Sequence, residues 1–153
     1  GTTDITRTVV LGFITDDMKE MKNSIACDLG GYVAEELKFG THYPGASDDL
    51  FHASAKAQNM VLLFGMSDVI GPISFMEYDD ASQTGKINIL MYGNDIAYKA
   101  SCEIQKILND AEERAKDVLI KNKDILEQIA QELIEKHELV EEELSLIFSR
   151  INL

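Results

Sequence analysis

Apolar residues recur at steps of three and four along most of this chain, and this spacing constrains its fold more than any other feature. Between residues 18 and 37 the pattern comprises Met18, Met21, Ile25, Leu29, Tyr32, Val33 and Leu37, and a longer one extends from Ile96 to Leu119. Such spacing places apolar side chains on one face of an α-helix. The chain is therefore predicted to be mostly α-helical, with amphipathic helices packed as a bundle.

Residues that start and stop helices divide this pattern into segments. Thr15 to Asp17 suits a helix start, and Gly40 suits the end of the same helix. Gly93 to Asp95 suits the start of the longest helix. The expected helices therefore run from about Asp17 to Gly40, Ser47 to Gly65, Asn94 to Asn122, Ile125 to Leu139 and Val140 to Ile151.

Two stretches are expected to be extended. Residues 1–14 are rich in β-branched side chains and predict a short N-terminal strand or an extended arm. Residues 72–92 predict a hairpin, with strands at Ile73–Tyr78 and Ile87–Tyr92 and a polar loop between them. Because both elements are small, residues 1–153 are interpreted as a single helical domain with a small β element.

The charge balance of the chain excludes some partners. It carries 27 acidic and 14 basic residues, a net charge of −13. Such a field repels phosphate backbones and anionic membrane surfaces, so neither nucleic acid nor a membrane is expected to bind this segment. No run approaches the roughly 18 apolar residues that a membrane helix needs. Cys27 and Cys102 lie within expected helices and predict reduced, buried thiols in a soluble intracellular domain.

Carboxylates flank the turn that separates the first two expected helices. Glu35 and Glu36 come near the end of one helix, and Asp48 and Asp49 come at the start of the next. This arrangement can aim carboxylates at one point, as a metal site requires. From the spacing alone a structural role is favoured over a metal site. Acids at a helix start are ordinary caps, and adjacent glutamates on a helix point about 100° apart.

The histidines do not complete a metal site on their own. Only His42, His52 and His137 occur, and no HExxH pair is present. Asp49 and His52 are three residues apart and can share a helix face, but taken alone they are better explained as a capping aspartate and a surface histidine. His42 is expected in a solvated loop and His137 at a helix end. No phosphate-binding loop of the GxxxxGK[ST] type occurs either.

Three literal motifs carry more information than the periodicity. They are G-G-Y-V-A-E-E-L-K-F-G (30–40), P-G-A-S-D-D-L (44–50) and A-Q-N-M-V-L-L-F-G-M-S-D-V-I-G-P (57–72). In this order and with these gaps they resemble the peptidase domain of the FtsH family of ATP-dependent zinc metalloproteases. The later segments E-E-R-A-K-D-V-L and L-I-E-K-H-E-L-V-E-E-E-L resemble that family too. The resemblance extends over roughly residues 9 to 148.

The resemblance implies a helical fold and a role in proteolysis. In that family an HExxH motif supplies two zinc ligands and the general base, and the aspartate that closes G-A-S-x-D supplies the third ligand. That aspartate corresponds to Asp49, and the first glutamate of A-E-E, Glu35, corresponds to an acid that supports the site. Zinc is the implied cofactor of the complete domain. ATP is implied only for an upstream module, and the implied partners are polypeptide substrates and further copies in a hexameric ring.

The chain also departs from the family pattern. HExxH does not occur in these 153 residues, so the catalytic base is not placed here. Tyr32, Pro44 and Gln58 stand where the family motifs usually have Arg, Thr and Arg. We therefore expect a C-terminal portion of a peptidase domain that alone neither holds zinc tightly nor cleaves peptides, from a parent protein anchored by upstream membrane helices. The alternative is a degenerate, non-catalytic module for ring assembly or partner binding.

Overall fold

A computed structural model describes residues 17–151 of the chain. The strand or arm expected in residues 1–14 lies outside the described residues. The described elements confirm a mostly α-helical fold with a small antiparallel hairpin. In order they are α2 (Met18–Asp28), α3 (Gly30–Phe39), η1 (Pro44–Ala46), α4 (Ser47–Leu62), β1 (Met76–Asp79), β2 (Thr84–Ile87), α5 (Asn94–Lys121), α6 (Lys123–Lys136) and α7 (Glu141–Phe148).

The first predicted helix is in fact two helices. Asp17 starts α2 with a capping box, in which its Oδ1 accepts from the Glu20 amide at 2.8 Å and its own amide donates to Glu20 at 3.0 Å. The break falls at Leu29, immediately before Gly30 and Gly31, because consecutive glycines weaken a helix. Gly40 ends α3 in the left-handed conformation (φ 67°), as predicted.

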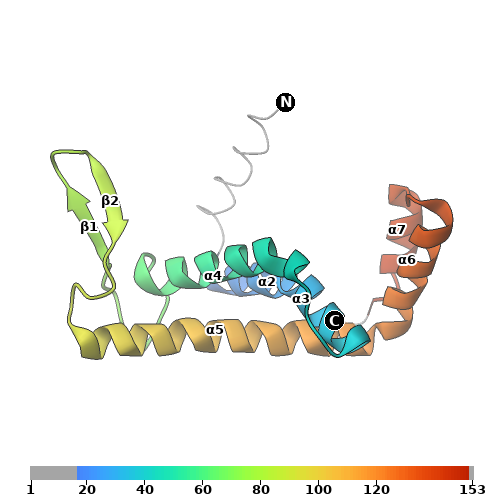
Figure 1. The fold of residues 1–153 in the computed structure, drawn as a ribbon, viewed down its shortest axis with the longest axis horizontal. Coiled ribbons are helices and arrows are strands. Elements are labelled where there is room, and N and C mark those ends of the chain that lie inside the picture. Colours follow the sequence, from blue (N-terminus) through green and yellow to red (C-terminus); the bar gives the residue numbers. More distant parts are fainter. Residues whose placement is uncertain (1–16, 152–153) are drawn as a thin grey trace.

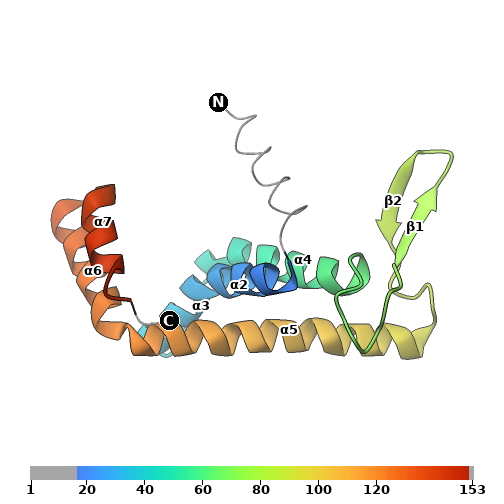
Figure 2. The ribbon, with the colours of Figure 1, turned by 180° about the vertical axis from the view of Figure 1, so that it is seen from behind.

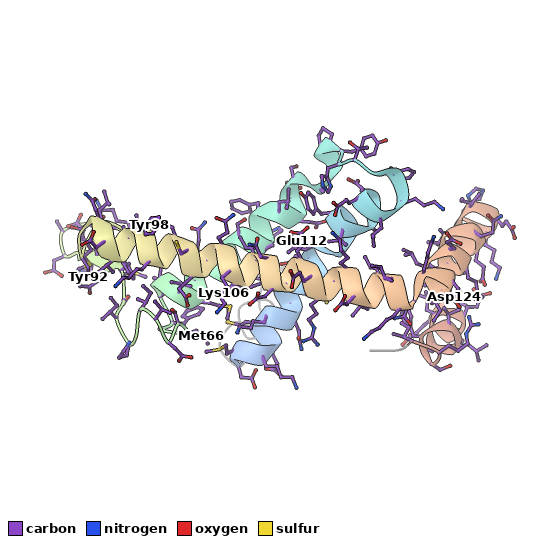
Figure 3. All side chains as sticks on the ribbon, turned by 90° about the horizontal axis from the view of Figure 1, so that it is seen from below. Met66, Tyr92, Tyr98, Lys106, Glu112 and Asp124 are labelled. Atoms are coloured by element: carbon purple, nitrogen blue, oxygen red, sulfur yellow. The ribbon has the colours of Figure 1, made fainter. Side chains whose placement is uncertain are left out.

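The long helix α5 forms the base of the molecule, and α2, α3 and α4 lie along it (Figure 1). The helices α2, α4 and α5 all contact one another. The fully buried Ile25, Met60 and Val61 form the centre of the core, and Ala53 and Ala57 on α4 are fully buried as well. These small residues allow close helix approach. Figure 3 shows α5 from below, with Tyr92 and Tyr98 at one end and Asp124 at the other.

The predicted hairpin is present, but its strands are shorter and shifted. Met76 pairs with Ile87 and Asp79 with Thr84, and all strand side chains are exposed. The start of the first predicted strand instead enters the core. Phe75 is fully buried, its amide donates to the Leu62 carbonyl, and its carbonyl accepts from the Asn88 amide, each at 2.8 Å. The hairpin therefore projects from one end of the helical layer (Figures 1 and 2).

At the opposite end, α6 and α7 form a helical hairpin that rises from the end of α5 (Figure 2). The predicted break lies at Asn122, which is buried, and its side-chain amide donates to the Val118 carbonyl at 2.8 Å. His137 ends α6 with φ 64°, as expected for a helix-end residue. The ammonium of Lys136 joins the two helices through Glu132 on α6 (3.3 Å) and Glu143 on α7 (2.7 Å).

The prediction of buried cysteines is wrong. Cys27 on α2 and Cys102 on α5 are free thiols, but both are exposed. Cys27 directly follows the buried Ala26, and Cys102 lies two residues after the fully buried Ala100. One or two steps of about 100° around a helix suffice to turn a side chain outward. Within the described residues, no helix is both long enough and apolar enough to cross a membrane.

Candidate functional site

The corner between α3 and α4 brings the predicted site residues together. After Gly40 the chain turns through residues 41–43 and enters η1, whose first residue is Pro44. Ala46 is buried and anchors this turn to the body, and α4 begins at the next residue, Ser47. The connection is short, and the ring of Pro44 fixes the backbone φ angle of that residue. The turn therefore determines where the first residues of α4 lie.

Asp49 lies in the first turn of α4 and is exposed. The start of α4 has no side-chain capping hydrogen bond, so Asp49 is not a cap. Within the described residues its carboxylate accepts no hydrogen bond and makes no ion pair. Its Oδ2 instead lies against α3, 3.5 Å from the position that a Cβ on Gly31 would occupy. The carboxylate of Asp49 is therefore available to a ligand.

Glu35 lies on the same face of α3, four residues beyond Gly31. Its Oε2 accepts from the backbone amide of Tyr43 at 3.0 Å, and the side chain is half-buried. Glu35 therefore holds the turn that leads to Asp49. Its neighbour Glu36 points elsewhere and pairs with Lys116 on α5 at 3.1 Å. The hydrogen bond that Lys116 donates to Glu36, together with the negative charge of that carboxylate, raises the pKa of the Lys116 ammonium above its ordinary value.

The histidines occupy three separate environments. His42 is exposed in the turn, as predicted, and its ring stacks on Tyr32 of α3 with centroids 3.8 Å apart. His52 is exposed on α4 and meets Phe51 edge to face. His137 lies at the distant end of α6. The predicted Asp49–His52 pair shares α4, but no contact joins the two side chains.

The described residues contain no group of three or more His, Cys, Asp or Glu side chains that could hold a metal ion. A zinc centre uses three or four ligands. Asp49 fits one carboxylate position of such a centre because it is exposed and has no partner in the described structure. Glu35 fits a supporting position because it already braces the adjacent backbone.

A groove of about 570 Å³ lies elsewhere, at the far end of α4. It is lined by Leu62, Ile87, Ile104 and neighbouring apolar or uncharged polar side chains, and no ionisable residue borders it. It therefore offers no group for acid–base or metal chemistry. The α3–α4 corner, in contrast, carries the carboxylates of Glu35 and Asp49.

The sequence did not reveal how Tyr32, His42 and Gly31 contribute to this corner. In the sequence Tyr32 stands out only as a member of the apolar stripe and as a departure from the family motif, and His42 only as a loop residue. The available signal was the four-residue spacing of Gly31 and Glu35, which places both on one face of a helix. The contact across the turn depends on the path of residues 41–46, which periodicity does not determine.

A helical domain with one available aspartate and a bracing glutamate at a helix–turn–helix corner is consistent with the metallopeptidase class, and comparison with protein families supports that class. The family described as Peptidase family M41 matches residues 13–147. Because the match covers most of the chain, this protein belongs to that peptidase family. The resemblance drawn from the three motifs is thereby confirmed.

Individual relatives agree with this assignment. The ATP-dependent zinc metalloprotease FtsH of Bacillus subtilis (strain 168) is 41% identical over 122 residues, which cover 75% of this chain and 18% of that protein. FtsH 4 of Sorangium cellulosum (strain So ce56) is 38% identical, covering 78% of this chain and 19% of that protein. FtsH 3 of Synechocystis sp. (strain ATCC 27184 / PCC 6803 / Kazusa) is 34% identical over 142 residues, covering 86% and 22%. The chain thus spans about a fifth of the length of these relatives.

Proposed function

We propose that this chain is the C-terminal portion of the peptidase domain of an ATP-dependent zinc metalloendopeptidase that degrades proteins. The observation that carries the proposal is the Asp49 carboxylate, which is exposed, has no partner in the described structure and lies against Gly31. The family match over residues 13–147 supports the same conclusion.

In this proposal Asp49 provides the single carboxylate ligand. Glu35 keeps the Tyr43 amide in place and so fixes the turn before α4. Zinc with an open coordination position lowers the pKa of bound water and polarises a carbonyl, which is the chemistry of peptide hydrolysis. Two histidine ligands and the general base must come from residues beyond this sequence, so the chain alone is expected to be inactive.

The wider context is proposed on the same basis. The named relatives are ATP-dependent proteases, so ATP use is assigned to a module outside this chain. Polypeptides are the proposed substrates and a ring of identical copies the proposed assembly. An intracellular position, with a membrane anchor elsewhere in the parent protein, completes the proposal.

A chimera tests the role of Asp49. Residues 13–147 would replace the matching segment of the Bacillus subtilis relative, which is 41% identical. We expect the chimera to retain zinc and degrade casein with ATP. Asp49→Asn should lower zinc retention and casein cleavage by at least about tenfold, because losing a ligand costs no less than losing a residue that supports one. Zinc content by mass spectrometry and casein cleavage are the measurements.

Asp48→Asn is the matched control. It removes the same charge from the same turn of α4 and should leave zinc content and cleavage near the parent values. Equal losses in the two variants would contradict the assignment of Asp49. A chimera that assembles and hydrolyses ATP but holds no zinc would instead favour the alternative of a non-catalytic module.

A further inference from the structure

Residues of α3 contact the turn that leads to Asp49 at several points along the helix. Gly31 lies beneath the Asp49 carboxylate, and Tyr32 stacks on His42 with an angle of 4° between the rings. One turn further along, Glu35 accepts from the Tyr43 amide. At the end of the helix Phe39 meets the Tyr43 ring edge to face, with centroids 6.0 Å apart.

We propose that Tyr32 and His42 are positioning residues, whose stacked rings fix residues 41–46 and thereby the place of Asp49. The metal-binding consequence rests on the proposed function, whereas the fixing of the turn does not. Neither residue touches the proposed ligand position directly. Their contribution is to narrow the range of positions that the start of α4 can adopt.

The path from the stack to Asp49 is short and stiff. His42 and Asp49 are seven positions apart, and between them lie Pro44, the single 3₁₀ turn η1 and the buried Ala46. Proline fixes one backbone angle, and a buried anchor limits lateral movement. If residues 41–43 move, the first residues of α4, including Asp49, therefore move with them.

The stack holds His42 itself, whereas the contacts from Glu35 and Phe39 both act on Tyr43. His42 and Tyr43 are exposed, and Gly40 before them is conformationally free at φ 67°. Because the His42 imidazole is exposed, burial contributes little to fixing its position, and the stacked ring of Tyr32 is the contact that holds it. An aromatic pair contributes about 0.5–1.5 kcal/mol beyond its buried area, equivalent to roughly a two- to tenfold change in a population.

Hydrogen exchange of the full 153-residue chain tests the fixing of the turn. Tyr32→Ala and His42→Ala should each raise the exchange rate of the amides in residues 43–49 about two- to tenfold, with α5 unchanged. Tyr32→Phe keeps the stacking ring and should exchange like the parent. His52→Ala, an exposed histidine beside Phe51, is the matched control and should have no effect on the turn.

Zinc affinity of the chimera tests the consequence for Asp49. Tyr32→Ala should weaken zinc binding about two- to tenfold, and Tyr32→Phe should restore it. An unchanged exchange rate in Tyr32→Ala, or equal effects of the Ala and Phe variants, would overturn the inference that the stack fixes the turn. Faster exchange with unchanged zinc affinity would overturn the inference that the stack positions Asp49. If Asp49→Asn itself keeps zinc, the proposed function fails, and the exchange result still decides the role of the stack.

Discussion

Gly31 is the residue of α3 that lies against the Asp49 carboxylate. It is helical and has no positive φ, so its absent side chain serves the approach of Asp49 and not the backbone. A Cβ at this position would meet Asp49 Oδ2 at 3.5 Å, an ordinary van der Waals distance. A methyl group therefore fits, whereas a branched side chain would reach into the space of the carboxylate.

This difference predicts opposite outcomes for two substitutions. Gly31→Ala should stabilise the chain by about 0.5–1 kcal/mol, because alanine loses less backbone entropy than glycine in a helix. Its chimera should keep zinc. Gly31→Val should reduce zinc retention, because its added methyl groups would enter the space of the Asp49 carboxylate and displace it. Urea unfolding and zinc content are the measurements, and zinc loss in both variants would contradict this account.

At the scale of elements, the sequence identified which helices form but not where the chain bends. Gly40 and Gly93 marked ends that the structure confirms. The break at Leu29 was missed because Leu29 keeps helical angles (φ −77°, ψ −6°) and contributes to the same apolar stripe. The strand boundaries were misplaced because Phe75 has the β-propensity of a strand residue but is held in the core.

The candidate site was predictable to a similar extent. Asp49 and Glu35 followed from literal motifs, and the corner of α3 and α4 contains both. The stacking of His42 on Tyr32 was not predictable, because it joins residues ten positions apart across a turn that contains Gly40. Contacts of this kind depend on tertiary path and not on local propensity.

Phe75 is predicted to anchor the β-hairpin to the end of α4. Its side chain is fully buried, and Tyr92 packs edge to face on it at 5.3 Å. Phe75→Ala should lower the free energy of unfolding by about 3–5 kcal/mol, the usual cost of a cavity of this size. Phe51→Ala should change it by less than about 0.5 kcal/mol, because Phe51 is 69% exposed. Chemical denaturation measures both, and similar losses would contradict the assigned core.

The α6–α7 hairpin is predicted to loosen in acid. Hydrogen bonds from Gln128 and Lys136 lower the pKa of Glu132, and hydrogen bonds from Lys136 and the Val140 amide lower that of Glu143. Because both folded pKa values lie below the ordinary value of 4.5, this stabilisation is present above that pH and is lost as pH falls through the folded values. Hydrogen bonds to Glu143 and Glu132 raise the pKa of Lys136 above its ordinary value of 10.5. The stabilisation that its positive charge gives the α6–α7 hairpin is therefore lost only above that pH.

Hydrogen exchange of the α7 amides, corrected for intrinsic rates, measures this effect between pH 6 and pH 3. Lys136→Met should raise exchange at pH 6 part of the way toward that of the parent at pH 3, because Gln128 still donates to Glu132 and the Val140 amide to Glu143. Lys123→Met removes an exposed lysine from the same helix and is the control. An α7 exchange rate that is independent of pH in the parent would rule out the electrostatic link between the two helices.

At the scale of the whole molecule, large exposed rings occur on both helices of the α3–α4 corner. Phe39 and Tyr43, whose rings meet edge to face, are 63% and 54% exposed, and Phe51 on α4 is 69% exposed. Clustered aromatic groups of this size mark surfaces that bind other protein. The net charge of −13 opposes association between copies, and added salt screens that repulsion. Whether the isolated chain associates is therefore decided by the balance of these two terms.

We expect the apolar term to dominate once the charge is screened. Sedimentation velocity should show reversible self-association of the isolated chain that increases with concentration and with salt from 0.05 to 0.5 M, values chosen to span roughly 14 Å to 4 Å of Debye length. Phe51→Ser should reduce the association, because it removes an exposed ring without opening a cavity. Tyr98→Ser removes an equally exposed ring (72%) from the distant end of α5 and should leave it unchanged. A monomer at every concentration and salt, or equal effects of the two variants, would show that this corner does not drive the association.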